Sequence, residues 1–235
     1  MKNWQISDLD INVDAILRGQ GADPDIIRDR SPRLIDIAEK ALNDATGLLE
    51  PRVLIEDLQV ITYQHEILKL ENDKQLSGPL VTGHLVGARS VIVAVCTVGS
   101  KIDDYASRVM DDDIVLGLAI DGVGSAAVEA LANGVCREIE LEAAEKGFQT
   151  TIPLSPGMIG WGVEEGQPVI FDLMDPSKVG VELSPYYIMA PRKSLSMIIG
   201  VGPGINSGER ICDYCAMRET CRYQDQYEGA QDLER

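Results

Sequence analysis

The stretch SVIVAVCTVGSKIDDYASRVMDDDIVLGLAIDGVGSAA, residues 90–127, decides how this 235-residue chain folds. It opens with an unbroken apolar run, residues 90–99, which ends at glycine and predicts a strand covered on both faces. Residues 102–110 predict a short helix. Asp111 to Asp113 then supply caps and negative charge for the start of a long helix towards Gly147. The stretch therefore predicts a buried strand that leads into two helices.

On both sides of this stretch, the spacing of apolar residues and the positions of proline and glycine predict further helices and strands. Residues 31–47 carry apolar side chains at helical spacing, with Ser31 as the cap, Pro32 in the first turn and Gly47 at the end. The other predicted elements are strand and turn at 54–70, a short helix at 169–174, and two strands within 181–202 divided by a turn at Pro191 and Arg192. Tyr186 and Tyr187 lie in the first of these two strands, so we expect one of them to pack inward.

Charge and targeting signals narrow the classes of partner. The chain has 21 basic and 38 acidic residues, a formal charge of −17, which repels nucleic acid and anionic lipid surfaces. The first residues, MKNWQISDLD, do not form a signal peptide, and we expect no segment with the roughly 20 apolar residues needed to span a bilayer. We therefore expect a cytoplasmic protein that binds neither nucleic acid nor membrane.

The predicted long helix contains a turn with almost no side-chain bulk. Gly122, Gly124 and Ser125 lie there, followed by two alanines. A glycine inside a helix costs roughly 1 kcal/mol relative to alanine, so its presence needs a reason. Either another helix packs closely at this turn or a ligand approaches it.

Three segments, taken in order, resemble the activation domain of cobalamin-dependent methionine synthase and its free-standing relatives. Residues 96–133 resemble the family's T-x-G turn followed by a helix with Asp and small residues. LSPGMIGW, residues 154–161, is similar to the family's S-P-G-Y loop. LSPYYIMAPRKSLSMIIGV, residues 183–201, resembles the pattern that leads into a strand. The resemblance covers roughly residues 10–203, and its order makes it stronger than any single motif.

The resemblance implies a fold and a function. The fold is α+β, with helices packed on a twisted, mainly antiparallel sheet, and we expect one core within residues 1–205. The implied function is that of an accessory protein of cobalamin-dependent methyl transfer, which docks a corrinoid protein or a cobalamin-dependent methyltransferase and supports its reductive reactivation. In the family, S-adenosylmethionine lies in a shallow groove beside the S-P-G-Y loop and supplies the methyl group.

The same resemblance implies a set of pocket residues. The acid that the family directs at the ligand falls on Ser125, with Glu129 one turn later. Pro153 and Met158 replace the family's arginine and tyrosine, so the S-adenosylmethionine-binding residues are partly lost. The alternative is a turn that only shapes the sheet edge. The cofactor-binding candidates are Ser125, Glu129, Ser155, Pro156, Gly157, Met158, Pro191 and Ser194.

The last 30 residues form a cysteine-rich tail, residues 206–235, after the composition shift at GPGINSG. Cys212, Cys215 and Cys221 have the spacing C-x2-C-x5-C, in which the first pair can reach one metal. Zinc needs a fourth ligand, for which His65, His84, Cys96 and Cys136 are candidates, whereas an iron–sulfur cluster can be held by three thiolates. Reduced surface thiols or a disulfide are the simpler alternatives. The sequence thus also allows a non-enzymatic iron–sulfur or zinc module that uses the scaffold for protein interaction or electron transfer.

Overall fold

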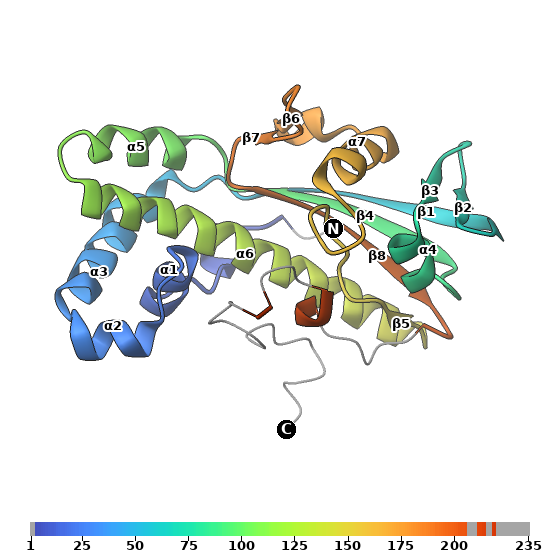
Figure 1. Ribbon diagram of the computed structural model, residues 1–235, viewed down its shortest axis with the longest axis horizontal. Coiled ribbons are helices and arrows are strands. Elements are labelled where there is room, and N and C mark those ends of the chain that lie inside the picture. Colours follow the sequence, from blue (N-terminus) through green and yellow to red (C-terminus); the bar gives the residue numbers. More distant parts are fainter. Residues whose placement is uncertain (1–2, 206–210, 215–217, 220–235) are drawn as a thin grey trace.

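The computed structural model describes residues 3–205, 211–214 and 218–219 of the chain. Figure 1 shows its helices and strands. The helices are η1 (Ile6–Asp8), α1 (Val13–Gly19), α2 (Pro24–Arg30), α3 (Arg33–Ala45), η2 (Thr46–Leu48), α4 (Pro79–His84), α5 (Lys101–Met110), α6 (Ile114–Glu145), α7 (Val163–Leu173), η3 (Pro176–Val179) and η4 (Ile211–Tyr214). The strands are β1 (Arg52–Gln64), β2 (Ile67–Leu70), β3 (Gln75–Ser77), β4 (Ser90–Thr97), β5 (Gln149–Thr150), β6 (Glu182–Leu183), β7 (Met189–Ala190) and β8 (Ser194–Gly202).

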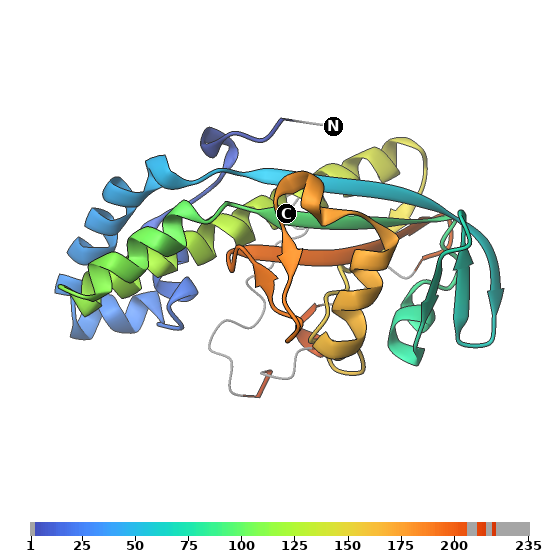
Figure 2. The same cartoon turned by 90° about the horizontal axis from the view of Figure 1, so that it is seen from above.

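Six strands form one antiparallel sheet in the order β3-β2-β1-β4-β8-β5, so the predicted α+β class is confirmed. The first part of β1 pairs with β4 and its end pairs with β2, and the register shifts between Val60 and Thr62. A register shift bends a strand, which lets the β2–β3 end curl away from the central strands (Figure 2). β4 lies between β1 and β8 and is buried along nearly its whole length, as its apolar run predicted.

The expectation of a single core is wrong, because each face of the central sheet carries its own hydrophobic cluster. The first core joins α1, α3, α5 and α6 to one face through residues such as Ala94 and Met197. The second core joins α4, α7 and the segment around Trp161 to the other face through residues such as Val93 and Ile198. Figure 1 views the central strands nearly edge-on, with α6 below them and α7 above. Neighbouring strand residues point to opposite faces, so two buried faces give two cores.

Close helix packing accounts for part of the small-residue turn of α6. A Cβ atom on Gly122 would lie 2.9 Å from the carbonyl oxygen of Ile16, and one on Gly19 would lie 2.9 Å from the carbonyl oxygen of Gly122. Both contacts are too short for a real Cβ atom, so glycine is required where α1 crosses α6. Asp113 starts the helix by accepting a hydrogen bond from the backbone N–H of Leu116 at 3.0 Å, as predicted.

The expectation that no segment is apolar enough to span a bilayer is also wrong. α6 has 32 residues and a window with mean hydropathy 1.7, so by length and composition alone it is able to cross a membrane. In this fold 56% of that window is buried inside the protein. α6 packs against α1, α3 and α5 and against the sheet. A helix that is buried in a protein core has the same apolar composition as a helix that spans a membrane.

The structure corrects the boundaries of three predicted elements. Helix 31–47 is confirmed as α3, although Ser31 contributes its backbone carbonyl rather than a side-chain cap, and the helix ends before Gly47. The helix predicted at 169–174 begins earlier, at Val163. The first strand predicted within 181–202 is instead a short hairpin, β6–β7, while the second is β8.

The hairpin also explains why neither tyrosine packs inward. Tyr186 is 81% exposed and Tyr187 is 37% exposed, so that prediction is wrong. The backbone N–H of Tyr187 donates to the carbonyl oxygen of Ser184, and Tyr187 has a φ of 61°. A turn with a left-handed residue reverses the chain after two strand residues, which leaves the tyrosines at the tip.

Candidate functional site

Five polar residues from α5, α6 and the two positions before β8 converge beside the first core, and we call them the Lys193 cluster: Asp103, Asp121, Ser125, Arg192 and Lys193. The Nζ atom of Lys193 lies 2.9 Å from Oδ1 of Asp121 and donates to Oγ of Ser125 at 2.9 Å. Only 12% of the Lys193 side chain is exposed. The cluster therefore contains a largely buried cation that links the segment just before β8 to α6.

Gly124 makes room for this lysine. A Cβ atom on Gly124 would lie 3.0 Å from Cγ and 3.1 Å from Cε of Lys193. The small-residue turn thus serves two purposes, since Gly122 admits α1 while Gly124 admits the stem of Lys193. At Gly124, the group that comes close to the helix is therefore a side chain of the same chain, that of Lys193.

Asp103 is the most buried acid of the cluster, with 9% of its surface exposed. Its Oδ2 accepts from the backbone N–H of Arg192 at 3.2 Å, whereas its Oδ1 lies 3.8 Å from Nη2 of Arg192, beyond hydrogen-bond distance. Burial raises the pKa of the Asp103 carboxyl group, and the positive charges of Arg192 and Lys193 oppose that rise. The pKa of the Asp103 carboxyl group therefore depends on the positive charges of Arg192 and Lys193.

The start of β8 places two predicted pocket residues next to the cluster. Pro191 follows a cis peptide bond, and the Oγ atom of Ser194 lies 2.7 Å from the carbonyl oxygen of Pro191 and 2.9 Å from Oγ1 of Thr97. The backbone carbonyl of Lys193 accepts from the N–H of Val98 at 3.1 Å. These bonds fix the backbone from which Lys193 extends. Ser125, Pro191 and Ser194 are thus brought together through Lys193.

The predicted Ser-Pro-Gly loop, residues 155–161, folds into a closed turn. The backbone N–H of Ser155 donates to Sδ of Met158 at 3.2 Å, and the N–H of Gly157 donates to the carbonyl oxygen of Trp161 at 2.8 Å. Gly157 has a φ of 104°, which its neighbours in the turn require. Trp161 is 3% exposed, and a Cβ on Gly166 would lie 2.8 Å from its ring. Ser155, Pro156, Gly157 and Met158 therefore lie in a turn that packs on α7.

The loop and the Lys193 cluster lie against different cores. Met158 packs on the second core, with Trp161, whereas the neighbours of Ser125 in α6 belong to the first core. Glu129 lies one turn after Ser125 with its side chain exposed, yet neighbouring protein removes enough water to raise the pKa of its carboxyl group. The predicted pocket residues thus form two separate groups.

The proposed metal ligands are described only in part. Cys212 is half-buried in η4, while Cys215 and Cys221 lie outside the described residues. Within the described residues, no three His, Cys, Asp or Glu side chains converge as a metal site. Tyr214 of η4 contacts the loop, since its carbonyl oxygen accepts from the N–H of Ile159 at 3.1 Å.

Sequence reasoning missed Lys193, Asp121 and Asp103. One signal for the first of these was available, because Gly124 leaves space on α6 that some bulky group has to fill. The sequence did not say which group, since Lys193 is 68 positions from Ser125 along the chain.

Comparison with known proteins adds the fold relationship. No protein-family profile matches the sequence, and no curated protein matches it. The crystal structure of the MetH reactivation domain bound to AdoHcy superposes with a TM-score of 0.67 and 14% sequence identity. The match covers 90% of this chain and 81% of that chain. The chain therefore has the fold of the MetH reactivation domain.

Proposed function

We propose that this chain is an accessory protein of cobalamin-dependent methyl transfer, which docks a corrinoid protein and supports its reductive reactivation. The fold match to the MetH reactivation domain over 90% of the chain carries the proposal. The three resembling sequence segments support it, because they occur in the family's order along the chain. The net charge of −17 favours a partner with a neutral or basic docking face.

The described residues do not fit S-adenosylmethionine at the predicted pocket. The backbone N–H groups of Ser155, Gly157, Met158, Ile159 and Trp161 all donate within the chain. Oγ of Ser125 already accepts from the ammonium group of Lys193, and a hydroxyl group carries no charge to pair with the cationic groups of that ligand. We therefore assign the chain a docking role without a methyl-transfer step of its own.

The docking role is tested with cobalamin-loaded corrinoid proteins purified from the same cell. We expect saturable binding to one of them and a changed absorption spectrum of its cob(II)alamin. Ile159, 55% exposed within the Ser-Pro-Gly loop, offers a variant, because a charge at the centre of an interface costs about tenfold or more in affinity. We expect Ile159→Glu to weaken docking and Leu141→Glu, at a 60% exposed position of α6, to leave it unchanged.

Failure to bind any corrinoid protein would contradict the docking role. Equal effects of the two substitutions on docking would instead contradict a docking surface at the Ser-Pro-Gly loop. Calorimetric titration with S-adenosylmethionine is expected to give no saturable heat, and saturable binding would overturn the assignment of a role without methyl transfer.

We also propose that the cysteine tail binds zinc or an iron–sulfur cluster, with His84 as the ligand from the body of the fold. The rings of His84 and Tyr214 meet edge to face with centroids 4.6 Å apart, so His84 lies beside η4 and Cys212. Nδ1 of His84 lies 2.7 Å from the carbonyl oxygen of Leu80, and such a bond orients Nε2 as a metal ligand. Cys96 and Cys136 are buried in the first core, which makes them poor candidates.

Metal analysis and a visible spectrum after anaerobic purification test the tail. We expect bound metal in the purified protein, with absorbance only if the metal is iron. His84→Gln should lower metal affinity about tenfold or more, while His65→Gln, in the exposed turn after β1, should not. A metal-free protein would contradict the site, and equal metal content in both variants would remove His84 from it.

A further inference from the structure

A cavity lies beside Asp121, and no residue of the Ser-Pro-Gly loop lines it. It has a volume of about 370 Å³ and lies between α1, α2, α3 and the first turns of α6. Apolar side chains form most of its wall, among them Leu17, Leu34, Ile37 and Leu118. Cavities of this size and character are typical of small-molecule sites.

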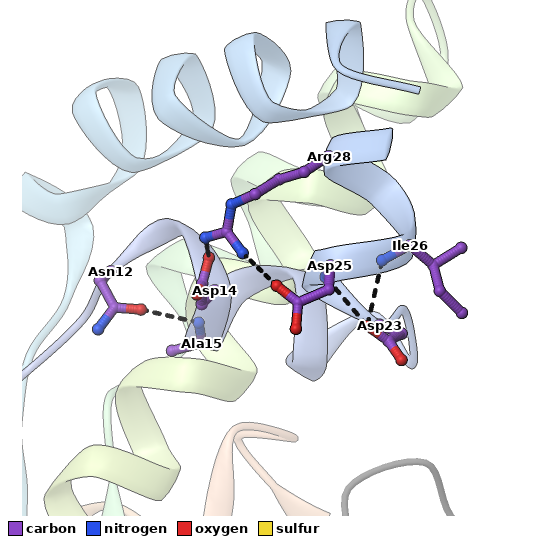
Figure 3. Close-up of polar contacts among 7 residues, drawn as sticks. All are labelled: Asn12, Asp14, Ala15, Asp23, Asp25, Ile26 and Arg28. Atoms are coloured by element: carbon purple, nitrogen blue, oxygen red, sulfur yellow. Dashed lines mark hydrogen bonds and ion pairs between the residues drawn. The ribbon is translucent and has the colours of Figure 1, made fainter. Parts of the chain in front are cut away.

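The helices around the cavity are held in place by their own polar contacts (Figure 3). The guanidinium group of Arg28 bonds to Asp14 of α1 and, at 3.0 Å, to Asp25 of its own helix α2. Asp23 caps α2 by accepting from the N–H groups of Asp25 and Ile26. Ile27, next to Arg28, lines the cavity, so the contact between Arg28 and Asp14 joins the two helices, α1 and α2, that form this wall.

The polar end of the cavity consists of Gly19, Gln20 and Asp121. Asp121 binds Lys193 through Oδ1, and a carboxylate accepts further hydrogen bonds at its second oxygen. The side chain of Asp121 is 32% exposed, and the whole chain carries a charge of −17. Both features favour a cationic donor over an anion at this end.

We propose that this cavity binds a small apolar amine, whose hydrocarbon part lies among Leu17, Leu34 and Leu118 and whose ammonium group donates to Asp121. The proposal does not depend on the docking role, because neither the loop nor the corrinoid partner takes part in it.

The proposal is tested by calorimetry of the full chain at neutral pH with n-butylamine, n-hexylamine, 1-hexanol and hexanoate. We expect saturable binding of one hexylamine, with affinity rising about fourfold for each methylene added between butylamine and hexylamine. Hexanol should bind more weakly, and hexanoate should not bind. Absence of saturable hexylamine binding, or hexanoate binding as tight as hexylamine binding, would overturn the proposal.

Two variants, each with a defined expectation, test whether hexylamine binds in this cavity. Leu118→Phe should weaken hexylamine binding, because the larger side chain takes up part of the cavity, while Leu141→Phe, at an exposed leucine of the same helix, should leave it unchanged. The double variant Asp121→Asn with Lys193→Met should remove the preference for hexylamine over hexanol without leaving a buried charge unpaired. Unchanged hexylamine binding by Leu118→Phe, or an unchanged preference in the double variant, would contradict the site.

Discussion

Trp161→Ala is expected to destabilise the protein by about 3–5 kcal/mol, the usual cost of removing a buried aromatic side chain. Trp161 is 3% exposed and packs in the second core against Gly166. Its backbone also closes the Ser-Pro-Gly loop, accepting from Gly157 and donating to Met158. Urea unfolding measured by circular dichroism checks the loss. We also expect weaker docking of the corrinoid partner, because the loop loses its anchor.

Trp161→Phe is the matched control. It keeps an aromatic ring against Gly166, so we expect a loss of less than about 1.5 kcal/mol. The chain has two tryptophans, Trp4 in the first core and Trp161 in the second, so fluorescence of Trp161→Phe reports the first core alone. A loss below about 1 kcal/mol for Trp161→Ala would show that the loop does not depend on this side chain.

The elements that the sequence predicted are those whose pattern is local. The unbroken apolar run of β4, the helical spacing of α3 and the aspartate cap of α6 each depend on residues close together in the chain. Their existence was therefore predictable, although their ends shifted by a few residues. The sheet itself followed from the family resemblance, because strand pairing joins distant segments that no single pattern identifies.

The parts that the sequence did not predict depend on contacts between distant segments. The sequence predicts one strand where the β6–β7 hairpin lies, because tyrosine is not a residue that usually adopts the left-handed backbone found at Tyr187. A single core was expected because an apolar strand does not reveal what covers each of its faces. The same limit applies to the candidate site, since the partners of Lys193 lie on another element, α6.

Asp121→Asn is expected to destabilise the protein by about 2–3 kcal/mol, because it leaves the buried ammonium group of Lys193 without its carboxylate. The loss lies below the usual range for a buried pair, since a third of the Asp121 side chain reaches solvent. Lys193→Met should cost less, because solvent can hydrate the remaining carboxylate. The double variant should recover much of the Asp121→Asn loss, with a coupling of about 1–3 kcal/mol. Urea unfolding of the four proteins measures the cycle.

We expect this coupling between Asp121 and Lys193 because the lysine is buried, and not merely because two opposite charges lie close together. Asp25 provides the comparison, because it pairs with Arg28 at 3.0 Å but its side chain is 94% exposed. We expect Asp25→Asn to have no measurable effect on stability, since exposed pairs are screened by solvent. Added salt should leave the Asp121–Lys193 coupling nearly unchanged, because buried charges are weakly screened. A coupling that disappears in salt would show that water reaches Lys193 and would contradict its burial as the cause.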